Sequence, residues 1–215
     1  MRIDLYSDSI CPWCYIGKRR LQRALTARPD IEAEVHWHAF QLNPWMPAAG
    51  VPREEYLRAK FGASDADRIY ANIREIGVTE GLDFRFDLMT RTPNTVRSHR
   101  LIAWAADQAG DDPQDAMVEA LFQVYFLQGK DLGSTAVLLE AVACAGLDVE
   151  LAEAFLAGDL YHDRVVEEDA HARRMGIQGV PCFIVDGTYA VSGAQEPEYF
   201  FPLFDLIKTG QAAAE

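Results

Sequence analysis

The sequence predicts an α/β fold in which two groups of strands are separated by a long block of helices. Residues 1–45 alternate between strand-like and helix-like patterns, whereas residues 46–177 show helical periodicity almost throughout. Two strand-like runs joined by a tight turn then return within residues 178–215. A chain of 215 residues is long enough to bury a sizeable core, so this arrangement needs no disulfide framework.

The opening segment predicts a strand, a helix and a second strand. Residues 2–7 alternate in polarity, as a half-buried strand does. After a short turn, residues 12–28 are rich in helix-forming residues, and residues 31–40 alternate again. The chain is therefore expected to open as β-α-β.

The helix expected over residues 12–28 has an apolar side and a charged side. Apolar residues recur at helical spacing, and we assign them to the inner side: Ile16, Leu21, Ala24 and Leu25. The positive charges are expected on the solvated side: Lys18, Arg19, Arg20 and Arg23.

Changes in composition divide the chain into three expected parts. Prolines and small residues over 43–50 mark a boundary, and glycine stop signals recur in the helical block that follows. We expect residues 1–45 and 178–215 to form one domain, and residues 46–177 to form an all-helical insertion within it.

The last part predicts a hairpin and a closing helix. Residues 182–186 and 188–192 are strand-like, and the Asp186-Gly187 pair at their junction is a strong hairpin signal. A helix is expected from about Pro197 onward. The order β-β-α would let these strands join the opening ones in a single sheet.

The charge balance and the hydropathy pattern argue against several function classes. A net charge of −13, from 33 acidic and 20 basic residues, opposes binding to a phosphate backbone or to an anionic membrane surface. Charged residues interrupt every apolar stretch well before the ~18 residues that a membrane span requires. No basic segment followed by an apolar one precedes the first expected strand, so we expect a cytoplasmic protein without nucleic-acid or membrane partners.

The run Cys11-Pro12-Trp13-Cys14 carries the clearest chemical signal. A close pair of cysteines beside a β-α-β pattern indicates redox chemistry in a reducing compartment. Residues three apart on a helix lie on one face, so the two sulfur atoms can meet and form a disulfide.

Position along the helix separates the roles of the two cysteines. Proline suits the first helical position, which makes Cys11 the N-cap and directs its sulfur toward the free amides of Trp13 and Cys14. The positive end of the helix dipole favours a thiolate there. Cys11 is therefore the expected nucleophile and Cys14 the resolving cysteine, with Trp13 shielding the site and contacting substrate.

Two other interpretations of the cysteine pair stay open. The pair could form half of a zinc site in a non-catalytic binding module, but a structural zinc site takes about four ligands. Cys144 and Cys182 have no partner at metal-binding spacing, which weakens that interpretation. Alternatively, the two cysteines could be incidental core residues.

Several separated runs share a pattern with one known family: residues 9–17, 40–44, 94–95, 99–100, 129–131, 179–181 and 192–195. Together they resemble the DsbA-like thioredoxin-fold oxidoreductases, in particular the FrnE-like branch. The resemblance covers nearly the whole chain. It implies a thioredoxin fold interrupted by a large all-helical insertion, and a protein disulfide oxidoreductase or isomerase activity.

The resemblance also implies how the site is built and what it works with. It implies a cis Val180-Pro181 bond beside the dithiol, with the Val180 backbone pairing with an extended substrate chain. Pro12 and Trp13 join these two as expected substrate-binding residues. It further implies disulfide- or thiol-containing protein substrates, recycling by a thioredoxin or glutathione system, and neither an organic cofactor nor a metal. Glutathione as a co-substrate and a homodimer both stay open.

The same fold includes proteins of a different reaction class. Glutathione-dependent 2-hydroxychromene-2-carboxylate isomerases and kappa-class glutathione transferases resemble this chain in architecture. They usually place a serine where Cys11 stands. Cys11 therefore favours disulfide exchange, and a glutathione-dependent isomerase or transferase is the alternative.

The remaining cysteines and histidines have less specific interpretations. Cys182 is expected to be a buried core residue, with a third redox thiol as the alternative, and Cys144 is expected in the core through its helical stripe. His36 and His38 share one face of a strand, where they either cap the sheet or help a proton leave the resolving cysteine. His99 either serves the site or fixes packing of the inserted helices.

Overall fold

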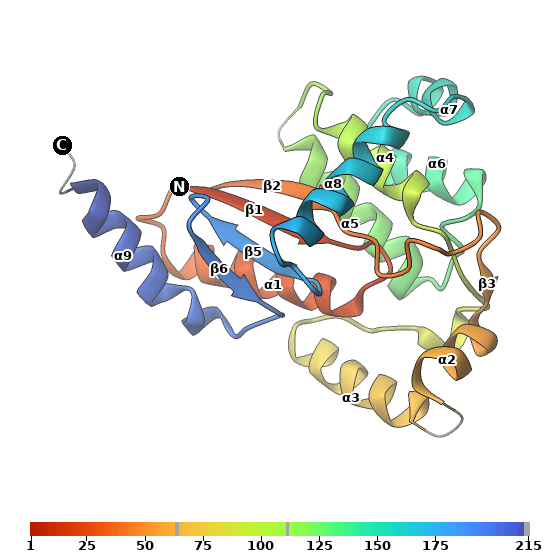
Figure 1. Ribbon diagram of the computed structural model, residues 1–215, viewed down its shortest axis with the longest axis horizontal. Helices are drawn as coiled ribbons and strands as arrows, with labels where there is room; N and C mark the ends of the chain where they lie inside the picture. The colour runs from red at the N-terminus through yellow and green to blue at the C-terminus, as the bar shows by residue number, and fades with distance from the viewer. Residues whose placement is uncertain (63–64, 111, 213–215) are drawn as a thin grey trace.

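A four-stranded sheet in the order β2-β1-β5-β6 forms the centre of the computed structural model (Figure 1). The structure describes residues 1–62, 65–110 and 112–212, so the predicted ranges 46–177 and 178–215 include residues outside those described. The strands of the sheet are β1 (Arg2–Ser7), β2 (Glu34–Ala39), β5 (Cys182–Val185) and β6 (Tyr189–Ser192). β1 pairs in parallel with β2 and antiparallel with β5, and β6 pairs antiparallel with β5. The expected joining of the first and last strands in one sheet is therefore confirmed.

Helices occupy both sides of this sheet and most of the segment between β2 and β5 (Figure 1). They are α1 (Pro12–Ala27), α2 (Arg53–Phe61), α3 (Ala66–Thr79), α4 (Val96–Ala105), α5 (Pro113–Phe122), α6 (Thr135–Cys144), α7 (Val149–Ala157), α8 (His162–Arg174) and α9 (Phe201–Ala212). Shorter helical turns are η1 (Phe86–Leu88), η2 (Gln123–Leu127) and η3 (Pro197–Tyr199). The predicted fold class is confirmed, while the boundaries near residues 45 and 177 stay a prediction.

One feature of the inserted block was not expected from the sequence. Two very short strands, β3 (Val51–Pro52) and β4 (Arg91–Thr92), pair antiparallel with each other. The backbone amide of Arg53 extends this pairing by donating to the carbonyl of Thr90 at 2.9 Å. The pairing brings the start of α2 next to the segment that precedes α4.

The two faces of the central sheet carry separate apolar cores. The larger core contains residues from the sheet, from α1 and from the end of the chain, including Leu5, Ile16, Phe183 and Phe204. The smaller core lies on the opposite face, under α8: Tyr6, Phe40, Ala172 and Cys182. The alternation of side chains along β1 and β5 produces this division, because neighbouring residues of a strand point to opposite faces.

Two of the four basic side chains of α1 are not exposed to solvent as expected. Lys18 and Arg20 are buried, not solvated. The Lys18 ammonium donates to Asp115 at 2.8 Å and lies 3.1 Å from Glu119, both on α5, and Arg20 donates to Glu80 at 2.8 Å. The inserted helices supply these carboxylates and cover α1 from outside, which the periodicity of α1 by itself does not reveal. The inner stripe of Ile16, Leu21 and Ala24 is buried as predicted.

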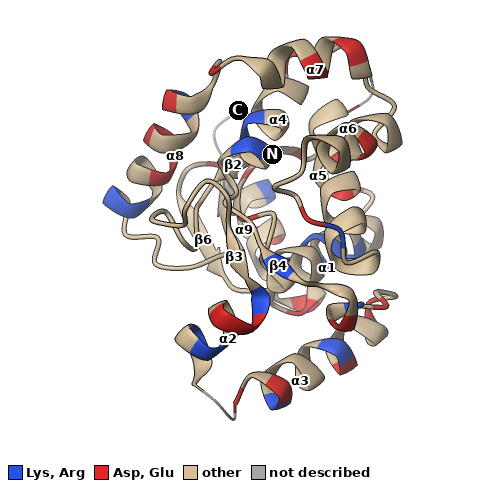
Figure 2. Ribbon diagram, turned by 90° about the vertical axis from the view of Figure 1, so that its right-hand side faces the viewer, with Lys and Arg blue, Asp and Glu red and all other residues tan. Residues whose placement is uncertain are grey.

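Elsewhere the charges are mixed over the surface. Figure 2 shows acidic and basic residues interspersed along α2, α3 and α8 on the side that it presents. Within the described residues, no helix combines the length and the apolarity that crossing a membrane requires.

Candidate active site

Cys11 lies at the N-terminus of α1, as predicted. It is the N-cap residue, with extended backbone angles, and Pro12 occupies the first turn. Its amide donates to the carbonyl of Asp8 at 2.9 Å, which holds the turn between β1 and α1.

The sulfur of Cys11 does not cap the helix as expected. The amide of Cys14 already donates to the carbonyl of Cys11 at 3.0 Å, so the backbone of Cys11 takes the place that its side chain was expected to fill. The Cys11 thiol instead donates to the carbonyl of Val180, with 3.5 Å between sulfur and oxygen. The Cys11 side chain therefore contacts the loop before β5 as well as belonging to the start of α1.

Cys14 lies one turn deeper and is fully buried. Burial raises the pKa of its thiol well above the ordinary value, and the neighbouring Cys11 thiol raises this pKa further. Cys14 is thereby kept protonated near neutral pH until the environment of the pair changes. Cys11 is 4% exposed and Cys14 has no exposed surface, so both thiols are buried and Cys14 lies deeper.

The loop before β5 contacts α1 at a glycine. The Val180–Pro181 peptide bond is cis, as the resemblance implied. A Cβ placed on Gly17 would stand 2.9 Å from Cγ of Pro181, so the proline ring lies directly against the helix backbone. This contact holds the Val180 carbonyl beside the thiol of Cys11.

The dithiol opens into a cavity of about 260 Å³. Four of the six predicted site residues line it: Cys11, Pro12, Trp13 and Val180. Cys14 and Pro181 lie behind this lining. The opposite wall comes from α2, α3 and β4, elements for which the sequence indicated no role in the site.

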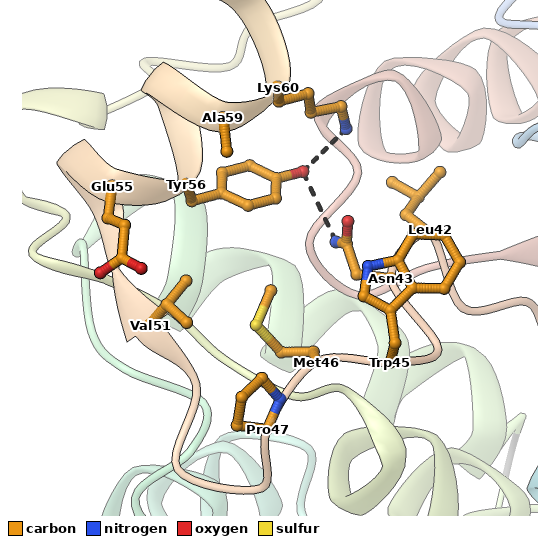
Figure 3. A pocket seen from close by; sticks show the side chains of 10 residues that line it. All are labelled: Leu42, Asn43, Trp45, Met46, Pro47, Val51, Glu55, Tyr56, Ala59 and Lys60. Carbon is orange, nitrogen blue, oxygen red and sulfur yellow. Dashed lines mark hydrogen bonds between the residues drawn. The ribbon is translucent and has the colours of Figure 1, made fainter.

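A second cavity of about 430 Å³ adjoins the first and is mostly apolar (Figure 3). The two share Leu42, Tyr56 and Lys60 as lining residues. The Tyr56 hydroxyl accepts from the ammonium of Lys60 at 2.7 Å and from the side-chain amide of Asn43 at 3.5 Å. Figure 3 shows Trp45 and the other apolar side chains around this polar group.

A buried polar cluster lies behind the turn that carries the dithiol. The carboxylate of Asp8 has no exposed surface and accepts from the amide of Leu42 at 2.7 Å and from that of Ile10 at 3.3 Å. Nε2 of His99 lies 3.5 Å from this carboxylate. His99, on α4, therefore packs against the turn before α1 without a hydrogen bond from its Nε2 to a described residue, which agrees with its packing interpretation. Asp8 was missed because a single acidic residue in a turn carries no distinctive pattern.

The histidines of β2 lie away from the dithiol. Nε2 of His38 is 2.7 Å from a carboxylate oxygen of Asp4, and its ring stacks on Tyr6 with centroids 5.0 Å apart. Tyr6 belongs to the smaller core under α8, whereas Cys14 belongs to the larger core on the other face. His38 therefore caps the sheet surface and is not placed to take a proton from Cys14.

The two other cysteines have opposite surroundings. Cys182 pairs across the sheet with Tyr6 and is buried in the smaller core, and this burial raises the pKa of its thiol. That position separates it by the sheet from Cys11 and Cys14, as expected of a core residue. Cys144 is exposed at the end of α6, so its predicted place in the core is wrong. The apolar stripe of α6 ends before its last residue.

No group of three or more His, Cys, Asp or Glu side chains in the described part of the chain is arranged to hold a metal ion. The zinc interpretation of the cysteine pair thus finds no ligand set there.

A model of the DSBA-like thioredoxin domain matches residues 2–201. The chain belongs to this family. This family is one of thiol oxidoreductases and isomerases, which agrees with the cysteine pair at the start of α1.

Several known proteins resemble this chain in sequence or in fold. A probable DsbA oxidoreductase from Streptomyces coelicolor superposes with a TM-score of 0.85 at 33% identity, covering 95% of this chain and 88% of that one. The cytosolic disulfide reductase DsbM from Pseudomonas aeruginosa, solved with GSH, has the same fold at a TM-score of 0.67 and 20% identity, over 99% and 100% of the two chains. A 2-hydroxychromene-2-carboxylate isomerase gives a TM-score of 0.71 at 17% identity over the full length of both chains. The uncharacterized protein YwbO of Bacillus subtilis is 23% identical over 205 residues, 93% of this chain and 94% of its own.

Proposed function

We propose that this DsbA-like protein is a thiol–disulfide oxidoreductase that exchanges disulfides with protein or small thiol substrates through Cys11 and Cys14. One observation carries the proposal. The thiol of Cys11 lies at the positive end of α1, lines a cavity and contacts the Val180 carbonyl. Cys14 lies one turn deeper and is fully buried.

The reaction uses only the two cysteines and the substrate. The Cys11 thiolate attacks one sulfur of a substrate disulfide, the substrate S–S bond breaks, and the other substrate sulfur leaves as a thiolate. Cys14 then loses its proton and attacks the sulfur of Cys11, which releases the second substrate thiolate. The substrate gains two electrons, and the cysteine pair becomes a disulfide. The same steps in reverse oxidise a substrate dithiol.

The surroundings of the pair support the other roles that we propose. Pro12 and Trp13 form the near wall of the cavity, and the Val180 backbone with Pro181 offers an extended edge to a substrate chain. The exchange needs no organic cofactor. We place the protein in the cytoplasm, as the name of the similar cytosolic reductase suggests, with a thioredoxin or glutathione system returning the pair to its starting state.

Single serine variants test the proposal. Cys11→Ser is expected to abolish disulfide exchange, because it removes the attacking sulfur. Cys14→Ser is expected to halt the reaction after the first step, so that a mixed disulfide between Cys11 and substrate accumulates and is seen by mass spectrometry.

The alternative, a glutathione-dependent isomerase or transferase, predicts a different pattern. Such an enzyme would bind glutathione saturably and keep its turnover in Cys14→Ser, since it needs no resolving cysteine. Full turnover in that variant would therefore replace the present proposal with the alternative.

A further inference from the structure

Arg53 is a buried cation on the wall of the cavity above the dithiol. It is 7% exposed and lines the cavity together with Cys11. The carboxylate of the neighbouring Glu54 pairs with Arg58 instead, and among the described residues no ion pair involves Arg53. The guanidinium carbon lies 4.8 Å from the ring centre of Tyr70 and 5.9 Å from that of Phe86. A buried cation that forms no ion pair with a carboxylate of the protein can pair with an anionic ligand.

Thr92 provides a second unsatisfied group in the same wall. It is 1% exposed, lines the same cavity, and its hydroxyl oxygen has no hydrogen-bond partner among the described residues. The short pairing of β3 with β4 places Thr92 opposite Val51. Val51 precedes Arg53 by two residues. Buried polar atoms are normally paired, so an unpartnered hydroxyl in the same cavity lining as a buried arginine marks a place for a hydrogen-bonding ligand.

The charged residues that line the cavity beside Cys11 are all basic. Lys60 is the second cation of its lining, and no acidic residue is found among the described residues that line it. This contrasts with the net charge of −13 of the whole chain. A separate cavity of about 340 Å³ is lined by Arg53, by Arg74 and by two aspartates, Asp67 and Asp87. The Asp87 carboxylate is held by Arg85 at 2.7 and 3.0 Å, and among the described residues no ion pair joins Asp67 to Arg53.

We propose that Arg53 and the Thr92 hydroxyl bind a carboxylate of the substrate, and that the preferred substrates are small disulfides or thiols that carry a carboxylate. This inference rests on the proposed disulfide exchange at Cys11 and names its substrate class. The carboxylate accepts from both groups, while the disulfide of the same molecule reaches the Cys11 sulfur within one cavity. Its volume of about 260 Å³ accommodates an arm of a small molecule.

Three disulfides of similar length and different charge test the substrate class: 3,3′-dithiodipropionate, which is anionic, bis(2-hydroxyethyl) disulfide, which is neutral, and cystamine, which is cationic. The pre-reduced protein is mixed with each, and quenched-flow thiol trapping with mass spectrometry gives the rate of Cys11–Cys14 oxidation. The readout is the ratio of the anionic to the neutral rate constant, since this ratio cancels changes in the intrinsic reactivity of the dithiol.

We expect the wild-type ratio to exceed unity and the cationic disulfide to be slowest. Arg53→Gln should lower the ratio by about tenfold, because a hydrogen bond to a charged group is lost. The control Arg68→Gln removes the same charge from an exposed position on α3 and should leave the ratio unchanged. Thr92→Val keeps the test informative if Arg53→Gln misfolds. It should lower the ratio of rate constants and leave thermal stability equal or higher, because the hydroxyl has no partner among the described residues.

Each outcome decides the question. If all three disulfides oxidise the wild-type dithiol at similar rates, or if both Arg53→Gln and Thr92→Val keep the wild-type ratio, the carboxylate site is refuted while disulfide exchange stands. If none of the three produces a Cys11–Cys14 disulfide, the proposed function falls, and this inference falls with it.

Discussion

Gly17 and Pro181 lie in direct contact, so that α1 and the loop before β5 approach at the backbone of the helix. A Cβ on Gly17 would stand 2.9 Å from Cγ of Pro181 and 3.2 Å from Cζ of Phe183. The first turn of the same helix carries Cys11, whose thiol lies 3.5 Å from the carbonyl of Val180. A side chain at position 17 would therefore disturb both the core and the site.

Gly17→Ala is expected to lower the free energy of unfolding by about 1–3 kcal/mol, because overpacking outweighs the helix propensity that alanine gains. Urea unfolding of the reduced protein measures this change. Gly158→Ala is the matched control, since its Cβ would meet only the carbonyl oxygen of Phe155 at 4.0 Å. A Gly17→Ala variant as stable as this control would contradict the close contact.

The burial of Cys14 predicts a loss of stability at alkaline pH in the reduced protein. Burial and the adjacent Cys11 thiol raise the pKa of Cys14. A thiol with a raised pKa contributes stability that is complete below the pKa of the unfolded chain, about 8.5, and is lost as the pH rises through the folded-state pKa. The free energy of unfolding should therefore fall above about pH 8.5, and less steeply in Cys14→Ala. Equal slopes for the two proteins would show that Cys14 does not titrate as inferred.

The buried ammonium of Lys18 predicts that the free energy of unfolding depends on pH in the acid range. Burial opposes ionisation of Glu119, but the charge of Lys18 and hydrogen bonds from Tyr15 and Arg19 outweigh it and lower the pKa of Glu119 to about 2. A carboxyl with a lowered pKa contributes stability that is complete above the unfolded pKa of about 4.3 and is lost as the pH falls through the folded-state value. Lys18→Met should make this acid loss shallower.

The same substitution should destabilise the protein at neutral pH by about 3 kcal/mol, because it removes the buried cation that Asp115 and Glu119, both partly buried, share. Arg58→Met serves as the control, since Arg58 pairs with Glu54 on the surface and should contribute less than about 1 kcal/mol. Urea unfolding at neutral and acid pH compares the two variants. If Lys18→Met behaves like Arg58→Met, the ion pair with α5 is not formed as described.

The different exposure of Cys144 and Cys182 predicts different rates of labelling by a thiol reagent. In a Cys11→Ser, Cys14→Ser background, a thiol reagent should modify the exposed Cys144 rapidly and the buried Cys182 only on unfolding. Peptide mapping after a short exposure distinguishes the two. Rapid modification of Cys182 in the folded protein would contradict its place under α8.

Local patterns predicted the parts of the fold that depend on neighbours in the sequence. The alternation over residues 2–7 and the helix-forming run after Cys11 correspond to β1 and α1. The spacing of Cys11 and Cys14 likewise placed the first at the N-cap and the second one turn deeper, since both positions follow from helix geometry.

Features that depend on distant segments could not be predicted in this way. The placement of Arg53 and Thr92 in one cavity wall depends on the pairing of two strands of two residues each, which are too short to show any periodicity. The burial of Lys18 depends on carboxylates about a hundred positions along the chain, as its hydrogen bond to Asp115 shows. Local spacing also fails at the end of an element, where Cys144 emerges from an otherwise apolar helix.

Equilibration of the protein in glutathione redox buffers, followed by thiol-trapping mass spectrometry, tests the central claim most directly. We expect a reversible two-electron transition between a Cys11–Cys14 dithiol and its disulfide. The midpoint then distinguishes an oxidant, near about −120 mV, from a reductase, near about −270 mV. If no Cys11–Cys14 disulfide forms at any ratio of reduced to oxidised glutathione, the pair is not a redox couple and disulfide exchange is not the function of this protein.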